Sequence, residues 1–211
     1  MKERNLSRKE KERLWRRHHM LSSALALFAE EGYHNISMHK IANKAEFAIG
    51  TLYKFFRNKE DLYKALVTEM ATDYHRILTE VLAGEDDTLT VIRSYISAKS
   101  DFFADRITSL RLYFAETRGA SFNIAAGLDR DMLKLYNELV ERLAAVLEVG
   151  IERNVLRRMD PYYMAISLEG LTNAFLFCWL ENPERHSYEE NIPIITELFL
   201  KGSLAERLEE V

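Results

Sequence analysis

The chain has 211 residues, of which 47% are apolar and 29% charged, with eight glycines and three prolines. Because glycine and proline are scarce compared with average usage, long helices are favoured and a β-sandwich or barrel is not expected. The single cysteine, Cys178, excludes an intrachain disulfide framework and multi-cysteine zinc sites, which is typical of a cytoplasmic protein. The longest apolar run, from Ala174 to Leu180, is far shorter than the roughly 20 residues of a membrane helix, so we expect no membrane partner.

The formal net charge of −4 hides an asymmetry along the chain. Residues 1–60 hold 13 Lys or Arg and 7 Asp or Glu, a net charge of +6. Residues 61–211 hold 16 and 26, a net charge of −10. A basic end on an acidic body is expected when only that end meets a polyanion. The alternative is that the first twenty residues form a solvated tail, and charge alone does not decide between the two.

The predicted elements begin with a helix from about Ser7 to Glu31, which ends at Gly32, a residue suited to positive φ. Ser37 then caps a short helix with the inner face Met38, Ile41, Ala42 and Ala45.

After a turn at residues 46–48, a second short helix from Ile49 to Phe56 is expected to bury Leu52 and Phe56. That arrangement would leave Thr51, Tyr53 and Lys54 pointing outward. Asn58 caps the helix that follows. Two short helices joined by a tight turn and braced by a third form an arrangement that can place a helix in the major groove of DNA.

This segment resembles the TetR family of bacterial transcriptional repressors over about 45 residues, in order and without a gap. The matching residues are Met20, Leu21, Ala24, Leu27, Phe28, Gly32, Tyr33, Ser37, Met38, Ile41, Ala42, Ala45, Gly50, Thr51, Leu52, Tyr53, Phe56, Lys59, Glu60 and Leu62. The resemblance implies an all-α fold of about nine helices. It also implies a helix-turn-helix DNA-binding domain at 14–74, with its motif at about 37–56, and a ligand-binding and dimerisation domain at 75–211.

The resemblance also implies roles for individual residues. Ser37 would bind a phosphate, while Ile49, Gly50 and Thr51 would lie at the floor of the groove. Tyr53 and Lys54 would contact phosphates or base edges, and Lys59 would contact a phosphate from the first turn of the next helix. Each residue taken singly has a plainer interpretation: Tyr53 as a core aromatic, the two lysines as solvated surface and Ser37 as a simple cap.

Three positions depart from the usual family pattern. Glu46 stands where the turn usually has Gly, Ala48 where Ser is common, and Ile49 where Lys is common. Glu46 is expected to strain the turn, Ala48 to remove a helix cap and Ile49 to remove a cation. DNA affinity could then depend on a basic N-terminal arm, made of Arg4, Arg8, Lys9, Arg16 and Arg17.

Beyond residue 84 the pattern predicts helices at about 87–104 and 107–118, a linker from Gly119 to Gly127, and a long helix at 129–153. Asp160 and Pro161 are typical of a helix start, for a helix that reaches Glu181. A last helix ends near Gly202. Its start is ambiguous, because Ser187 could cap it while Pro193 would interrupt it one turn later.

The second part of the chain is expected to form a homodimer and to bind a small molecule. The run from Ala174 to Leu180 is apolar on every side, so either a partner covers one face or the helix is central in a monomer core. The predicted interface residues are Gly170, Ala174, Phe177, Ile195, Leu198 and Phe199. The predicted pocket for an apolar or aromatic effector is lined by Phe102, Phe103, Tyr113, Phe114, Tyr136, Phe175, Cys178 and Trp179.

Catalytic and metal chemistry find little support. His18 and His19 point about 100° apart on a helix and cannot share an ion, and Cys178 lies in an apolar run where a thiol is usually inert. We therefore expect neither a cofactor nor an enzyme. The sequence favours a ligand-responsive repressor that binds a palindromic double-stranded DNA operator as a dimer and is released by a small molecule. The alternative is a helical binding or interaction module without sequence-specific DNA binding.

Overall fold

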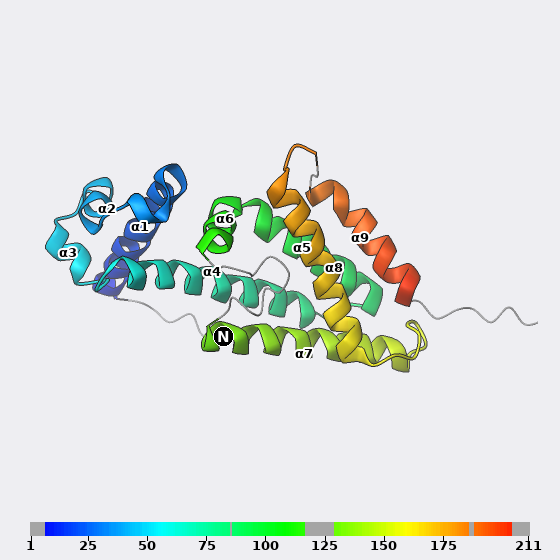
Figure 1. The fold of residues 1–211 in the computed structure, drawn as a ribbon. Coiled ribbons are helices and arrows are strands. Elements are labelled where there is room, and N and C mark those ends of the chain that lie inside the picture. Colours follow the sequence, from blue (N-terminus) through cyan, green and yellow to red (C-terminus); the bar gives the residue numbers. More distant parts are fainter. Residues whose placement is uncertain (1–6, 85, 117–128, 186–187, 204–211) are drawn as a thin grey trace, which may run out of the picture. The chain divides into compact units, whose positions relative to one another are not determined.

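The computed structural model describes residues 7–84, 86–116, 129–185 and 188–203, without the side chains of 114–116, 188 and 189. In these ranges the regular elements are nine α-helices and one 3₁₀ helix (Figure 1), in agreement with the predicted all-α class. The chain separates into two compact units, residues 1–70 and 71–211. The boundary at residue 74 between a DNA-binding and a ligand-binding domain stays a prediction.

The N-terminal unit contains α1 (Arg8–Glu31), η1 (Tyr33–Asn35), α2 (Met38–Lys44), α3 (Ile49–Tyr53) and the first part of α4 (Lys59–Leu82). A capping box begins α1: the hydroxyl of Ser7 accepts the N–H of Glu10, and the Glu10 carboxylate accepts the N–H of Ser7. The helix ends at Gly32, which has the expected positive φ of 81°, but its ψ of 145° leads the chain away extended rather than left-handed.

Apolar burial holds the short helices of this unit in place. Helices of five and seven residues are not stable alone, so α2 packs on α1 and α3 packs on α2. The buried side chains from α1 to the start of α4 include Met20, Leu21, Ala24, Leu27, Phe28, Ile41, Ala42, Leu52, Phe56 and Leu62.

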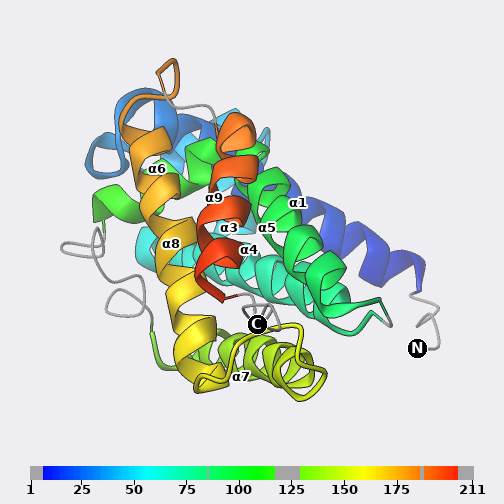
Figure 2. The same ribbon diagram turned by 90° about the vertical axis from the view of Figure 1, so that its right-hand side faces the viewer.

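The C-terminal unit contains the rest of α4 together with α5 (Thr88–Ala104), α6 (Ile107–Glu116), α7 (Arg130–Glu152), α8 (Pro161–Glu181) and α9 (Tyr188–Ser203). Within it α7 packs on α8, and α9 packs on both α5 and α8 (Figures 1 and 2). The carboxylates of Asp87, Asp129 and Asp160 cap α5, α7 and α8. The predicted start at Asp160 and Pro161 is confirmed, whereas the predicted linker at 119–127 lies outside the described residues.

Pro193 does not interrupt α9, which runs from Tyr188 through the proline to Ser203. The proline lies only one and a half turns inside the helix, where its missing N–H removes a single backbone hydrogen bond. Ser187, the predicted cap, lies outside the described residues.

By length and composition α8 is the one described helix that could cross a membrane. A core helix passes the same test, and α8 packs on both α7 and α9. One of its buried faces carries Glu169 and Thr172. We therefore assign α8 to the core of the C-terminal unit.

Candidate nucleic-acid interface and effector site

The turn between α2 and α3 is tight and strained at one residue. The N–H of Phe47 donates to the carbonyl of Ala42 at 2.9 Å, and the N–H of Glu46 donates to Asn43 at 3.1 Å. Glu46 has a φ of +57°, in the left-handed region where a residue with a Cβ costs roughly 1–2 kcal/mol. The strain predicted from Glu46 in place of glycine is therefore present.

Helix α3 is a single turn pinned by one buried residue, Leu52, and it presents its other face outward. Gly50 and Lys54 are exposed, and Tyr53 is 48% exposed. A Cβ added to Gly50 would meet nothing within 4 Å, so packing within the chain does not require glycine there. The outward surface of Gly50, Tyr53 and Lys54 is open to a large partner.

Other features of α3 differ from the prediction or refine it. The helix ends at Tyr53 rather than Phe56, although Phe56 is buried and its N–H still donates to Leu52. Ala48 occupies the N-cap without a side-chain hydrogen bond, as expected. Ile49 and Thr51 are half-buried, so they contribute less outward surface than Tyr53.

Ser37 and Lys59 both hold the local fold. The Ser37 hydroxyl accepts the N–H of Lys40 at 3.3 Å and is exposed, so it is a cap that also faces solvent. The Lys59 ammonium donates to the carbonyls of Tyr33 at 2.7 Å and His34 at 3.3 Å and lies 4.4 Å from the centre of the Tyr33 ring. A DNA phosphate is thus not needed to explain a lysine at the start of α4, because the carbonyls of η1 compensate its charge.

The cations of the N-terminal unit fall into paired and unpaired groups. Arg16 is bound to Glu12, and Arg17 is bound to Glu69 and lies over the Phe56 ring. Two residues of the predicted basic arm are therefore engaged within the fold, and Arg4 lies outside the described residues. Among the described residues Lys44 and Lys54 are exposed and make no ion pair, which leaves positive charge on both helices of the motif.

A cavity of about 80 Å³ lies between α4 and α7 in the C-terminal unit. Of the predicted pocket residues, Tyr136 lines it directly. Phe102 and Phe103 are buried and pack on Tyr74, another lining residue, with ring centres 5.2 and 5.5 Å away. The wall consists of Ala71, Tyr74, His75, Met132, Leu135, Tyr136 and Leu139.

The remaining predicted pocket residues differ in how deeply they are buried. Tyr113 and Trp179 are buried and Phe175 is half-buried. Cys178 is exposed on α8, which corrects its assignment to an internal pocket. The side chain of Phe114 lies outside the described residues.

A buried polar cluster in the same unit was not predicted from the sequence. The Lys99 ammonium donates to Glu169 Oε1 at 2.9 Å and to Thr172 Oγ1 at 2.7 Å, and the Tyr95 hydroxyl donates to Glu169 Oε1 at 2.7 Å. Burial lowers the pKa of Lys99, and Glu169 opposes that shift, while burial and then Glu169 raise the pKa of Tyr95. The available signal was a Lys and a Glu on the apolar faces of their helices.

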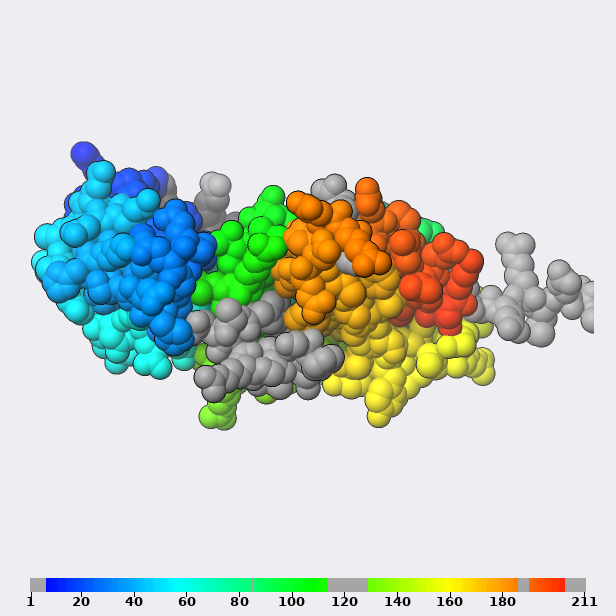
Figure 3. Space-filling model, turned by 45° about the horizontal axis from the view of Figure 1, so that its top comes forward, coloured from blue at the N-terminus to red at the C-terminus, as the bar shows by residue number. Residues whose placement is uncertain are grey.

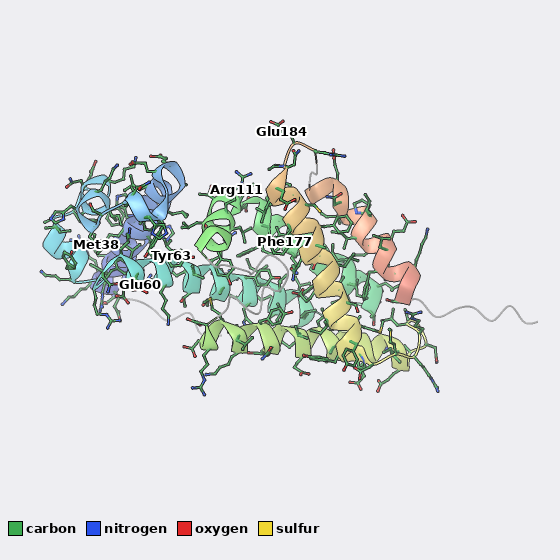
Figure 4. The ribbon with its side chains drawn as sticks, in the orientation of Figure 1. Met38, Glu60, Tyr63, Arg111, Phe177 and Glu184 are labelled. Atoms are coloured by element: carbon green, nitrogen blue, oxygen red, sulfur yellow. The ribbon has the colours of Figure 1, made fainter. Side chains whose placement is uncertain are left out.

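The predicted dimer residues occupy two different faces. Gly170 and Ala174 are exposed on α8, and Leu198 is 54% exposed on α9. Phe177 lies on α8 (Figure 4) and is half-buried. Ile195 and Phe199 are instead buried within the chain, at 0% and 6% exposure, which corrects their assignment to a subunit surface. The apolar residue of α9 that accompanies Leu198 outward is Ile194, which is 48% exposed.

Comparison with known proteins decides the family. Residues 20–66 match the family described as bacterial regulatory proteins, tetR family. The chain is a TetR family transcriptional regulator. It is therefore a DNA-binding protein, and the matched segment contains α2, the strained turn and α3 in full. In the described residues no group of three or more His, Cys, Asp or Glu side chains could hold a metal ion.

Relatives extend the similarity along most of the chain. The fatty acid metabolism regulator protein of Bacillus subtilis is 23% identical over 189 residues, which cover 87% of this regulator and 93% of the relative. A TetR/AcrR regulator structure from Thermobifida fusca is 24% identical, has a TM-score of 0.72 and covers 89% of this chain and 97% of that one. SmeT of Stenotrophomonas maltophilia in complex with triclosan is 18% identical, with a TM-score of 0.69 and coverages of 91% and 93%.

Proposed function

We propose that this regulator is a cytoplasmic repressor that binds a palindromic operator as a homodimer and is released by a small apolar or aromatic molecule. The observation that carries the proposal is α3, which is pinned by Leu52 and turns Gly50, Tyr53 and Lys54 outward. A helix turn that is anchored by one buried residue and otherwise free can enter a major groove.

The proposed DNA contacts follow from exposure and charge. Gly50 allows close approach of the backbone, and Tyr53 and Lys54 contact base edges or phosphates. The Ser37 hydroxyl contacts a phosphate while it caps α2. Ile49 and Thr51 lie at the margin of the contact, because they are half-buried. Lys59 orders η1 and adds positive charge near the duplex.

Helices α8 and α9 pack against each other within the chain (Figure 3). The proposed dimer uses the faces of these two helices that point away from the chain. On α8 the small residues Gly170 and Ala174 permit close approach of a second helix, and on α9 Ile194 and Leu198 supply apolar contact. An isologous four-helix interface would bury these residues and join two copies of the α2–α3 motif in one molecule.

The effector class is supported by the cavity and by the relatives. The cavity wall is mostly apolar and aromatic, which suits a molecule with an apolar body. A relative is named for fatty acid metabolism, and a structure of the same fold was determined with triclosan. These names concern other proteins, and they support the proposal of a small apolar effector here.

Fluorescence anisotropy on the DNA upstream of its own gene tests the proposal. The anisotropy of that labelled DNA should stay high with the protein bound, even when excess unlabelled, unrelated duplex is added. Tyr53→Ala and Lys54→Ala should each weaken binding by about tenfold, since such contacts contribute roughly 1–3 kcal/mol. Tyr53→Phe separates the ring from the hydroxyl, and Lys134→Ala, a change at an exposed lysine of α7, is the matched control.

The alternative of a helical binding module makes the opposite prediction. Binding would then be equal for specific and unrelated DNA and would disappear with modest salt. That result, or unchanged affinity in both α3 variants, would overturn the repressor proposal.

A further inference from the structure

The first part of α1 extends beyond the core of the N-terminal unit. Residues 8–15 are all exposed, and the first buried residue of the helix is Met20. A free helix of this length is marginal in water, but here the capping box at Ser7 begins it and the rest of α1 continues it. Because residues 8–15 are exposed, apolar burial does not explain why the extension is present.

Aromatic contacts connect this extension to the turn between α2 and α3. The rings of Trp15 and His19 are stacked, with centres 5.3 Å apart and planes 4° apart. His19 meets Phe47 nearly at a right angle, with ring centres 6.0 Å apart, and the guanidinium of Arg16 lies 6.0 Å from the centre of the Phe47 ring. Phe47 belongs to the turn that leads into α3. The side of α1 that carries Trp15 therefore adjoins the proposed DNA-binding motif.

The same side of α1 carries unpaired positive charge. Helical spacing places Arg8 and Lys11 in line with Trp15, two turns and one turn before it. Both are exposed, and within the described residues neither makes an ion pair. The neighbouring carboxylate, Glu12, is bound to Arg16. Trp15 is 61% exposed, so a large apolar ring lies in the open beside two free cations.

We propose that the face formed by Arg8, Lys11 and Trp15, here called the Trp15 face, is a second DNA contact that binds the backbone beside the segment contacted by α3. The inference rests on the proposed function, since it extends the contact with the same duplex. Arg8 and Lys11 bind phosphates, and the indole packs on the apolar side of the sugars. From His19 to Arg8 the helix rises about 17 Å, which corresponds to about five base pairs of B-DNA.

Two other cations of the extension provide a matched comparison. Lys9 and Arg13 are also exposed and make no ion pair among the residues that the structure describes. Helical spacing places them in a row that continues to Arg17, which is bound to Glu69 of α4. This row lies on nearly the opposite side of α1 from the Trp15 face. Removing two charges from either side therefore separates a specific contact from the general attraction between a basic segment and DNA.

The salt dependence of DNA binding tests the inference with the full-length protein. R8Q/K11Q should reduce the magnitude of the slope of log K against log salt concentration by about two, since each phosphate contact contributes about 0.9. Binding at 0.1 M salt should weaken by roughly tenfold or more, on the upstream DNA and on unrelated duplex alike, because backbone contacts do not read sequence. K9Q/R13Q should leave the slope nearly unchanged.

Trp15 provides a direct readout, because the only other tryptophan of the chain is Trp179 in the C-terminal unit. In Trp179→Phe, whose folding is checked by its melting curve, all indole fluorescence comes from Trp15. Bound DNA should protect this indole from quenching by acrylamide. If Trp179→Phe does not fold, Trp15→Ala in the otherwise unchanged protein decides, and it should weaken DNA binding by a few fold without changing the salt slope.

Equal slopes for R8Q/K11Q and K9Q/R13Q would overturn the inference, and so would a Trp15 that is quenched equally with and without DNA or a Trp15→Ala variant with undiminished affinity. A failure of the proposed function would be visible separately. It would show as equal binding of the upstream DNA and of unrelated duplex by the wild type, whatever the slopes of the variants.

Discussion

The two units of this regulator treat charge in opposite ways. In the N-terminal unit the core is apolar, and the half-buried Lys59 donates to the carbonyls of η1 rather than to a buried carboxylate. In the C-terminal unit a complete ion pair, Lys99 and Glu169, is buried between helices. This difference in the placement of charged side chains is consistent with different binding partners for the two units. The proposed DNA contact requires polar groups at the surface of the N-terminal unit, whereas the proposed recognition of a small molecule would require some of them inside the C-terminal unit.

The largest expected effect comes from breaking the buried pair on one side. Lys99→Met leaves the Glu169 carboxylate buried without its main partner, which should lower the free energy of unfolding by about 3–5 kcal/mol. The double variant K99M/E169Q should recover most of this loss, because no unpaired charge remains. Urea unfolding followed by circular dichroism measures both. If the single and double variants were equally stable, the pair would not be buried as described.

A smaller loss of unfolding free energy is expected in the N-terminal unit, where the substitution removes apolar packing rather than a charge. Leu52→Ala removes the residue that pins α3, and core truncations of this kind cost about 2–5 kcal/mol. Tyr53→Ala, one residue away on the exposed face, should leave the urea midpoint nearly unchanged while it weakens DNA binding. Equal destabilisation by the two changes would contradict the division of α3 into a buried and an outward face.

A third change sharpens the comparison at the strained turn. Glu46→Gly should stabilise the N-terminal unit by roughly 1 kcal/mol, because glycine adopts a φ of +57° without the penalty of a Cβ. Glu46→Gln keeps the strain and removes only the negative charge. Gly should therefore raise the melting temperature, while both variants strengthen DNA binding. A melting temperature raised as much by Gln as by Gly would assign the effect to charge.

The sequence predicted best those features that depend on a few neighbouring residues. The caps at Ser37, Asn58 and Asp160 were predicted, since a cap is decided within three or four residues. The strained turn at Glu46 was predicted for the same reason. The partners of Lys59 within the chain were not predicted, because the carbonyls that accept its hydrogen bonds lie 25 and 26 residues earlier in the sequence.

Features that depend on the packing of distant helices could not be predicted in this way. Lys99 and Glu169 are 70 residues apart, so that nothing in the local pattern pairs them. In α9 the run of Ile194, Ile195, Leu198 and Phe199 is apolar on two faces. Its pattern does not tell which face packs inside the chain, and only the packing of α5 and α8 against it does. The assignment of Ile195 and Phe199 to a subunit surface was wrong for that reason.

The smallest expected effect concerns the pH dependence of stability at two helix caps. Asp87 on α5 carries a carboxylate that titrates, whereas Ser37 on α2 carries a hydroxyl that does not. The pKa of Asp87 is lowered because its carboxylate accepts the hydroxyl and N–H of Thr90 and the N–H of Leu89. Since the folded pKa lies below the unfolded value of about 3.9, the stabilisation is complete above that pH and is lost as the pH falls through the folded pKa.

Asp87→Asn keeps a cap that does not titrate. In acid its melting temperature should therefore fall less steeply than that of the wild type, while all other carboxylates cancel in the difference. Ser37→Asn, which exchanges one uncharged cap for another, should leave the acid profile unchanged. Parallel profiles for wild type and Asp87→Asn would show that the carboxylate cap of α5 contributes no acid sensitivity, so that the two units would differ in their buried charges alone.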